Sequence, residues 1–144
     1  MIEQDTVKLL RECDAGAKMG ISSIDDVMDY VKSEDLKRKL QDCKQEHEIL
    51  NGEIQSALER FHDDGKEPAA VAKGMSWLKT NVKLAVNESD ETVADLMTDG
   101  CDMGVKSLSK YLNKYKAADE DSKDIAKRLI NIEERLAVDI RGYL

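Results

Sequence analysis

Residues 33–61 read SEDLKRKLQDCKQEHEILNGEIQSALERF, and this stretch decides the fold. One set of positions in it recurs at alternating steps of three and four residues, the spacing of one face of an α-helix. Ser33 is a good N-cap residue, and acids follow it in the first turn, where the helix dipole favours them. We therefore expect a long amphipathic helix that ends at the polar run 63–67. Its stripe is Leu36, Leu40, Cys43, His47, Leu50, Ile54, Ala57 and Phe61.

Three further stretches carry stripes of the same kind, at about 3–31, from near Ser89, and after the polar run 118–122. A stripe on one face of a helix is buried only against partner helices. The first stripe is Val7, Leu10, Ala17, Ile21, Ile24, Met28 and Val31, with Asp14 at the missing step. The third is Ala94, Cys101, Val105, Leu108, Leu112 and Tyr115, and the fourth is Ala126, Leu129, Glu133, Leu136, Ile140 and Tyr143.

The composition of the 144 residues supports an all-helical chain. Aromatic residues make up 4% of it and there is one proline, a mix that disfavours strands. The net charge of −8 opposes binding to nucleic acid or anionic lipid, and no Lys/Arg cluster counters it. The chain has no apolar run long enough to span a membrane and no signal-peptide pattern at its start. We expect a cytoplasmic protein with neither a nucleic-acid nor a membrane partner.

Short links between the first and second helices, and between the third and fourth, predict two antiparallel hairpins, at about 3–62 and 89–144. Residues 63–88 form a long link, and structureless loops of that length are rare in compact domains. Pro68 suits the first turn of another helix, so we expect a helical crossover. The predicted fold is a single all-α domain, an antiparallel four-helix bundle with this crossover between its second and third helices.

The two hairpins also resemble each other in sequence. The pattern G-x-x-M-G-I-x-S-I at residues 16–24 returns as G-x-x-M-G-V-x-S-L at residues 100–108. In this register His47 matches Glu133, and Asp14 matches Thr98. A glycine inside a helix costs about 1 kcal/mol against alanine, so the repeated glycines should have a purpose. They are Gly16, Gly20, Gly100 and Gly104, and they indicate either close approach of the first and third helices or room for a ligand or partner chain there.

These features resemble the ferritin-like superfamily, and within it small bacterial branches of unknown function. The resemblance covers nearly the whole chain and rests on the glycine-centred repeats DAGAKMG (14–20) and DGCDMG (99–104), with Glu46-His47-Glu48 and Glu133-Glu134 late in each hairpin. It implies two helical hairpins joined by a crossover, and a tendency to self-associate.

Active members of that superfamily hold two metals by a Glu on each of two helices and a Glu-x-x-His on each of the others. Here the pattern fails, because Lys44 stands three residues before His47, Ile130 stands three before Glu133, and no histidine follows Glu133. The ligands that the resemblance leaves are His47, Glu133 and Asp102. We expect no iron-dependent oxidation chemistry, no catalytic residue and no resident cofactor, with iron, manganese or zinc as a weaker alternative.

Asp14, His47 and Glu133 each interrupt an apolar stripe. A polar group in a core must be paired or neutral. One interpretation is a hydrogen-bonded set in which His47 pairs with Glu133 or Asp14, with Thr98 as a neutral partner. A second is a histidine–carboxylate metal site. A third is that a small rotation of each helix brings these side chains to solvent.

Two other groups bear on function. Cys13, Cys43 and Cys101 are widely spaced, which favours reduced core thiols. Met75 and Trp77 form an apolar cluster outside the four stripes. They either pack on the bundle or, since Trp is a good interface anchor, mediate a homodimer.

Three hypotheses for function follow. The first is a non-catalytic ferritin-like protein that acts through helix surfaces as a homodimer or by binding a protein partner. The second is a metal-binding or redox protein with a degenerate site around His47, Glu133, Asp102 and Asp14. The third is a binding module that holds a small apolar ligand beside the four glycines.

Overall fold

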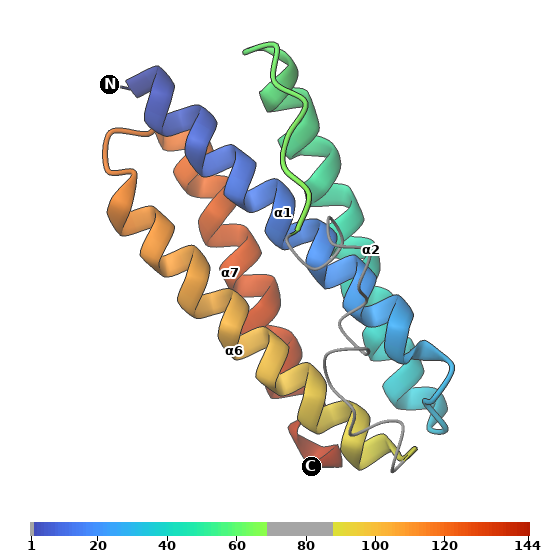
Figure 1. Cartoon of the computed structure of the whole chain (residues 1–144). Coiled ribbons are helices and arrows are strands. Elements are labelled where there is room, and N and C mark those ends of the chain that lie inside the picture. The colour runs from blue at the N-terminus through green and yellow to red at the C-terminus, as the bar shows by residue number, and fades with distance from the viewer. Residues whose placement is uncertain (1, 69–87) are drawn as a thin grey trace.

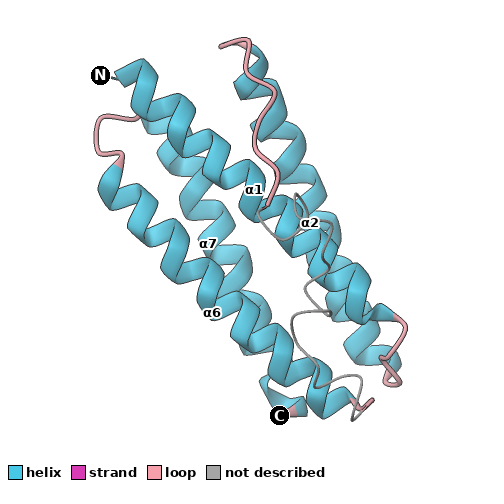
Figure 2. Cartoon of the chain, viewed as in Figure 1, coloured by secondary structure: helices cyan, strands magenta, loops and turns pink. Residues whose placement is uncertain are grey.

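A computed structural model describes residues 2–68 and 88–144 of the chain. Within these residues it contains four long helices and one short 3-10 turn. Figure 2 shows helices and loops and no strand in the described residues. The helices are α1 (Ile2–Met28), α2 (Glu34–Glu59), α6 (Asp90–Lys114) and α7 (Glu120–Ile140), and the turn η1 (Arg141–Tyr143) ends the chain. The predicted all-α four-helix bundle is confirmed.

Side-chain caps fix the starts of three helices. Ser33 accepts a hydrogen bond from the amide of Leu36 at 3.2 Å, and Ser89 accepts one from the amide of Thr92 at 3.1 Å. Asp119 accepts from the amide of Ser122 at 2.8 Å, so α7 begins inside the polar run that the sequence suggested would precede it. Each cap satisfies an amide that has no partner within its helix.

The first helix is shorter than its apolar pattern predicts. α1 ends at Met28 rather than at residue 31, although Val31 is still buried. The backbone amides of Lys32 and Ser33 donate instead to the carboxylate of Asp90, at 2.7 and 3.0 Å. The apolar pattern extends past the end of the helix because it reflects burial rather than helical backbone. Val31 is buried although it lies in the turn after α1.

The helices pack in an up-down-down-up order. Ion pairs of Arg128 with Glu53 and of Arg135 with Glu46 show that α2 and α7 are antiparallel. α1 and α6 are also antiparallel, since Ser33, just after α1, donates to Asp90 at the start of α6. α2 and α6 therefore run the same way (Figure 1). This is the connectivity of a bundle with one long crossover.

The expected crossover helix lies outside the described residues. Residues 60–68 contain no helix beyond a turn. The rest of the predicted crossover helix, with Met75 and Trp77, falls in residues 69–87, which are not described. The structure therefore does not test the predicted crossover helix or the predicted interface at Met75 and Trp77.

The core runs the length of the bundle and contains the predicted stripes. Leu40, Leu50, Leu129 and Leu136 are all at most 3% exposed. Ile21 and Val105, in contrast, are half-buried and are not part of this core. The core is also wider than one stripe per helix, because α1 contacts α2, α6 and α7 together. Buried residues beyond the predicted stripes include Leu9, Val27, Leu58, Val93, Leu96, Met97, Ile125 and Ile132.

Candidate functional site

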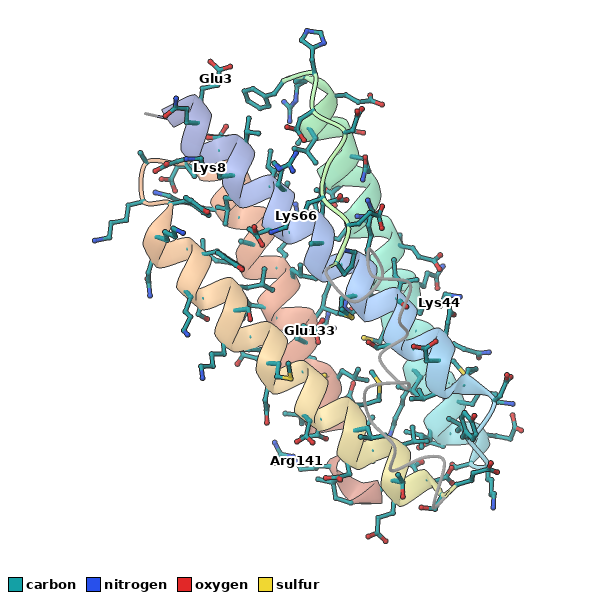
Figure 3. The ribbon with its side chains drawn as sticks, viewed as in Figure 1. Glu3, Lys8, Lys44, Lys66, Glu133 and Arg141 are labelled. Atoms are coloured by element: carbon teal, nitrogen blue, oxygen red, sulfur yellow. The ribbon has the colours of Figure 1, made fainter. Side chains whose placement is uncertain are left out.

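A buried pair of ionisable side chains lies at the centre of the bundle. The ring nitrogen Nε2 of His47, on α2, is 2.8 Å from Oε1 of Glu133, on α7. His47 is 1% exposed and Glu133 is 8% exposed. Figure 3 places Glu133 near mid-length, between α1 and α6. Of the partners that the sequence allowed for His47, the structure selects Glu133.

Both ring nitrogens of His47 face acceptors. Nδ1 lies 2.8 Å from the backbone carbonyl oxygen of Cys43, which accepts a hydrogen bond and donates none. Burial alone would lower the pKa of His47, but the hydrogen bonds to Cys43 and Glu133 and the charge of Glu133 outweigh it and raise that pKa to about 10. His47 is therefore protonated on both ring nitrogens at neutral pH.

The repeated glycines make room for this pair. A Cβ atom placed on Gly20 would lie 2.5 Å from Nε2 of His47, closer than any real contact. A Cβ on the matching Gly104 would lie 3.5 Å from Cδ of Glu133, an ordinary contact. The sequence repeat thus has a spatial counterpart, because each of the two glycines faces the buried ionisable residue of its own hairpin.

The glycine one turn earlier on α1 has a different role. A Cβ on Gly16 would lie 3.6 Å from a methyl of Leu129 and 3.8 Å from one of Leu108. The nearest neighbours of Gly16, Gly20 and Gly104 are all side chains rather than the backbone of a facing helix. These glycines therefore admit side chains of the core.

Asp14 is fully buried and makes its own set of contacts, separate from His47. Its Oδ1 accepts from the side-chain amides of Asn51, at 2.8 Å, and Gln55, at 2.5 Å. Its Oδ2 accepts from the backbone amide of Lys66 and pairs with the Lys18 ammonium, both at 2.9 Å. Four donors offset the cost of burying this carboxylate.

The Asp14 contacts hold the chain after α2 against α1. Gly65 packs so closely on Asp14 that a Cβ there would clash, and its φ of 90° suits glycine. Lys66 pairs with Glu12 at 2.5 Å, and Asp63 pairs with Arg11 at 2.9 Å. This segment, residues 63–68, lies along α1, where Lys66 contacts Glu12 and Glu67 contacts Lys18.

A cavity of about 340 Å³ opens beside the His47–Glu133 pair, between α1 and α6. This size falls within the range of small-molecule sites in proteins. Its lining includes all four repeated glycines. Met19, Met97, Met103 and Leu108 give it apolar walls, and Glu133 lies at its buried side. Lys66, Glu67 and Pro68 border it from the segment 63–68.

Of the four sequence-predicted metal ligands, only His47 and Glu133 come together. Asp102 is exposed on α6, and Asp14 is engaged with Asn51, Gln55 and Lys18. In residues 2–68 and 88–144 no group of three His, Cys, Asp or Glu side chains is placed to hold a metal ion. Thr98, expected as a neutral partner of the pair, has a buried hydroxyl oxygen with no hydrogen bond.

All three cysteines are buried and unpaired. Burial, followed by the charges of Glu12 and Asp14, raises the pKa of Cys13 to about 12. Burial and the carboxylate of Glu133 raise the pKa of Cys101. These two thiols therefore stay protonated and unreactive at neutral pH.

The comparisons with known proteins identify no relative. No family model matches the chain, and neither a curated protein nor a solved structure is significantly similar to it. Among the described helices, none has the length and apolar character needed to cross a membrane.

Several residues of the site could not be predicted from the sequence. Met97 was missed because it lies beside the stripe that predicts α6. Asn51 and Gln55 were missed because an amide on a helix gives no signal until its partner is known. The segment 63–68 reads only as a polar break, and the sole hint of its path is Gly65.

Proposed function

We propose that this protein is a non-catalytic binding protein that holds a small, largely apolar ligand in the cavity between α1 and α6. The observation that carries the proposal is the cavity itself, lined by both copies of the glycine repeat. Mid-helix glycines lower helix stability, so their recurrence at the walls of a cavity favours a role for the space.

The chemistry around the cavity supports binding rather than catalysis. His47 has a hydrogen-bond acceptor at each nitrogen, so it has no free lone pair to act as a base. The Cys101 thiol on the cavity wall is held protonated. The walls supply apolar contact, and Glu133 supplies one polar group to orient a ligand, the usual composition of a small-molecule site.

Titration with octanol, followed by the broadening of its own NMR signals, tests the proposal. We expect saturable binding to the full chain and its loss in Ala15→Trp, because Ala15 lines the cavity and a Trp there would fill it. The matched control is Ile49→Trp, which places the same ring at an exposed apolar position on α2. If octanol does not saturate, or binds Ala15→Trp as it binds the unmodified chain, the proposal is wrong.

A metal-binding role is a weaker proposal. Both nitrogens of His47 are engaged, so a metal could bind this imidazole only by displacing Cys43 or Glu133. Elemental analysis after loading with iron, zinc and manganese tests this role. A tight stoichiometric metal would favour the degenerate metal site over the ligand cavity.

Self-association stays a prediction. The large exposed apolar side chains in the described residues are Ile49, Met103, Val138 and Leu144, and each stands on a different element or at the chain end. Single exposed apolar residues are ordinary and do not mark an interface. The residues expected to anchor a homodimer are Met75 and Trp77. Mass by light scattering, with and without Trp77→Ser, decides whether they do.

A further inference from the structure

We infer that the ligand carries a positively charged amine, whose ammonium group binds the Glu133 carboxylate at the buried side of the cavity while its apolar body lies between α1 and α6. This inference rests on the proposed function and adds the chemical class of the ligand.

Each carboxylate on the described part of the cavity wall has a cationic partner. Among the described residues, three carboxylates line the cavity, those of Glu12, Glu67 and Glu133, together with one ammonium group, that of Lys66. Lys66 is already paired with Glu12 at 2.5 Å, and Glu67 lies 3.1 Å from the Lys18 ammonium. Glu133 pairs with His47, so the described lining residues offer an anionic ligand no free cation.

Glu133 is the carboxylate that a ligand would meet deepest in the cavity. Its side chain is 11% exposed, against 15% for Glu12, which is paired with Lys66, and 58% for Glu67. Oε1 is taken by His47, and Oε2 lies beside Gly104, 3.7 Å from the position that a Cβ would occupy. The missing side chain at Gly104 leaves the approach to this oxygen open from the cavity.

Glu133 has the capacity for a second strong donor. A carboxylate offers about four lone-pair sites, and its neighbours here are His47 and the weakly donating Cys101 thiol. An ammonium group binds a carboxylate by a charge-assisted hydrogen bond, about twice as strong as a neutral one. The amine can therefore bind without displacing His47, and the pair that orients Glu133 stays intact.

The test compares octylamine, octanol and octanoate, which share one apolar chain and differ in the head group. We expect octylamine to bind the unmodified protein about tenfold more tightly than octanol. Octanoate should bind more weakly than either. In Glu133→Gln the preference for the amine over the alcohol should fall to about one. Glu67→Gln removes the same charge from the cavity edge and should keep the preference.

The outcomes separate the two proposals. Equal binding of amine and alcohol, or tighter binding of octanoate, overturns the inference while leaving the ligand cavity in place. Loss of the preference in Glu67→Gln also overturns it, because the overall negative charge would then explain the selection. If none of the three compounds saturates, the proposed function itself fails. The comparison on the unmodified protein decides the inference even if Glu133→Gln does not fold.

Discussion

Substituting Gly20 by alanine adds one methyl group at the most crowded point of the buried pair. That methyl would lie 2.5 Å from Nε2 and 2.6 Å from Cδ2 of His47. His47 cannot turn aside freely, because hydrogen bonds to Cys43 and Glu133 hold both nitrogens. The added atom must therefore break the pair, which leaves a buried carboxylate without its cation.

The expected loss follows from two opposing effects. Breaking a buried ion pair costs about 3–5 kcal/mol, and alanine in place of a mid-helix glycine returns about 1 kcal/mol. Gly20→Ala should therefore lower the free energy of unfolding by about 2–4 kcal/mol, read from urea denaturation followed by helical circular dichroism. Two matched glycines serve as controls. Gly52→Ala, with nothing within 4 Å, should stabilise by up to about 1 kcal/mol, and Gly104→Ala should not destabilise.

The variant His47→Asn tests whether contact with His47 causes the loss of stability in Gly20→Ala. With His47→Asn already in place, the smaller side chain leaves room, and adding Gly20→Ala should cost little. If Gly20→Ala is as stable as Gly52→Ala in the otherwise unmodified chain, the close packing of Gly20 on His47 is refuted. An equal loss in the His47→Asn background would assign the cost to another contact.

Three further predictions follow. Because the pKa of His47 is raised to about 10, the folded chain binds one more proton than the unfolded chain between about pH 6.5 and pH 10. The stability that this pair contributes is full below about pH 6.5 and is lost as the pH rises through about 10. Urea midpoints measured across this range should show the slope, and Glu133→Gln should flatten it. Asp14→Asn should lower the free energy of unfolding by about 1.5–3 kcal/mol in the same assay, because four donors lose a charged acceptor. Its control, Asp25→Asn, removes an exposed ion pair with Lys44 and should change stability by less than about 1 kcal/mol. Equal losses would mean that Asp14 is not buried. The thiols of Cys13, Cys43 and Cys101 should react with a disulfide reagent only as fast as the chain opens, and rapid labelling of the folded protein would contradict their burial.

Helix periodicity and the internal repeat carried much of the prediction. Stripes at steps of three and four locate the four helices, and the repeat register matches His47 with Glu133 before any coordinates are known. The sequence also offered Asp14 as a partner for His47. The structure rejects it because the segment 63–68 turns back over α1 and brings the Lys66 amide to Asp14, with Asn51 and Gln55 beside it. Such a path depends on one left-handed glycine, Gly65, which no periodic pattern reveals.

The sequence could not decide whether a cavity lies beside the repeated glycines. Four matched glycines fit two physical outcomes, helices in contact or helices with space between them. Local sequence does not decide between these, because the outcome depends on what the opposite helices place against each glycine. Leu129 lies against Gly16, His47 against Gly20 and Glu133 against Gly104, and the cavity remains beside these glycines. Asp102 is separated from His47 and Glu133 because it lies on an exposed face of α6.

Methionine methyl groups offer the most direct test of the ligand cavity. In protein labelled at its methionine methyls, Met19, Met97 and Met103 report from the cavity wall, and Met28, at the end of α1 outside the cavity, is an internal control. During titration with octylamine, the account predicts saturable shifts of the three cavity methyls together, with Met28 unmoved. Shifts that spread equally to Met28, or cavity methyls that never move, would contradict it.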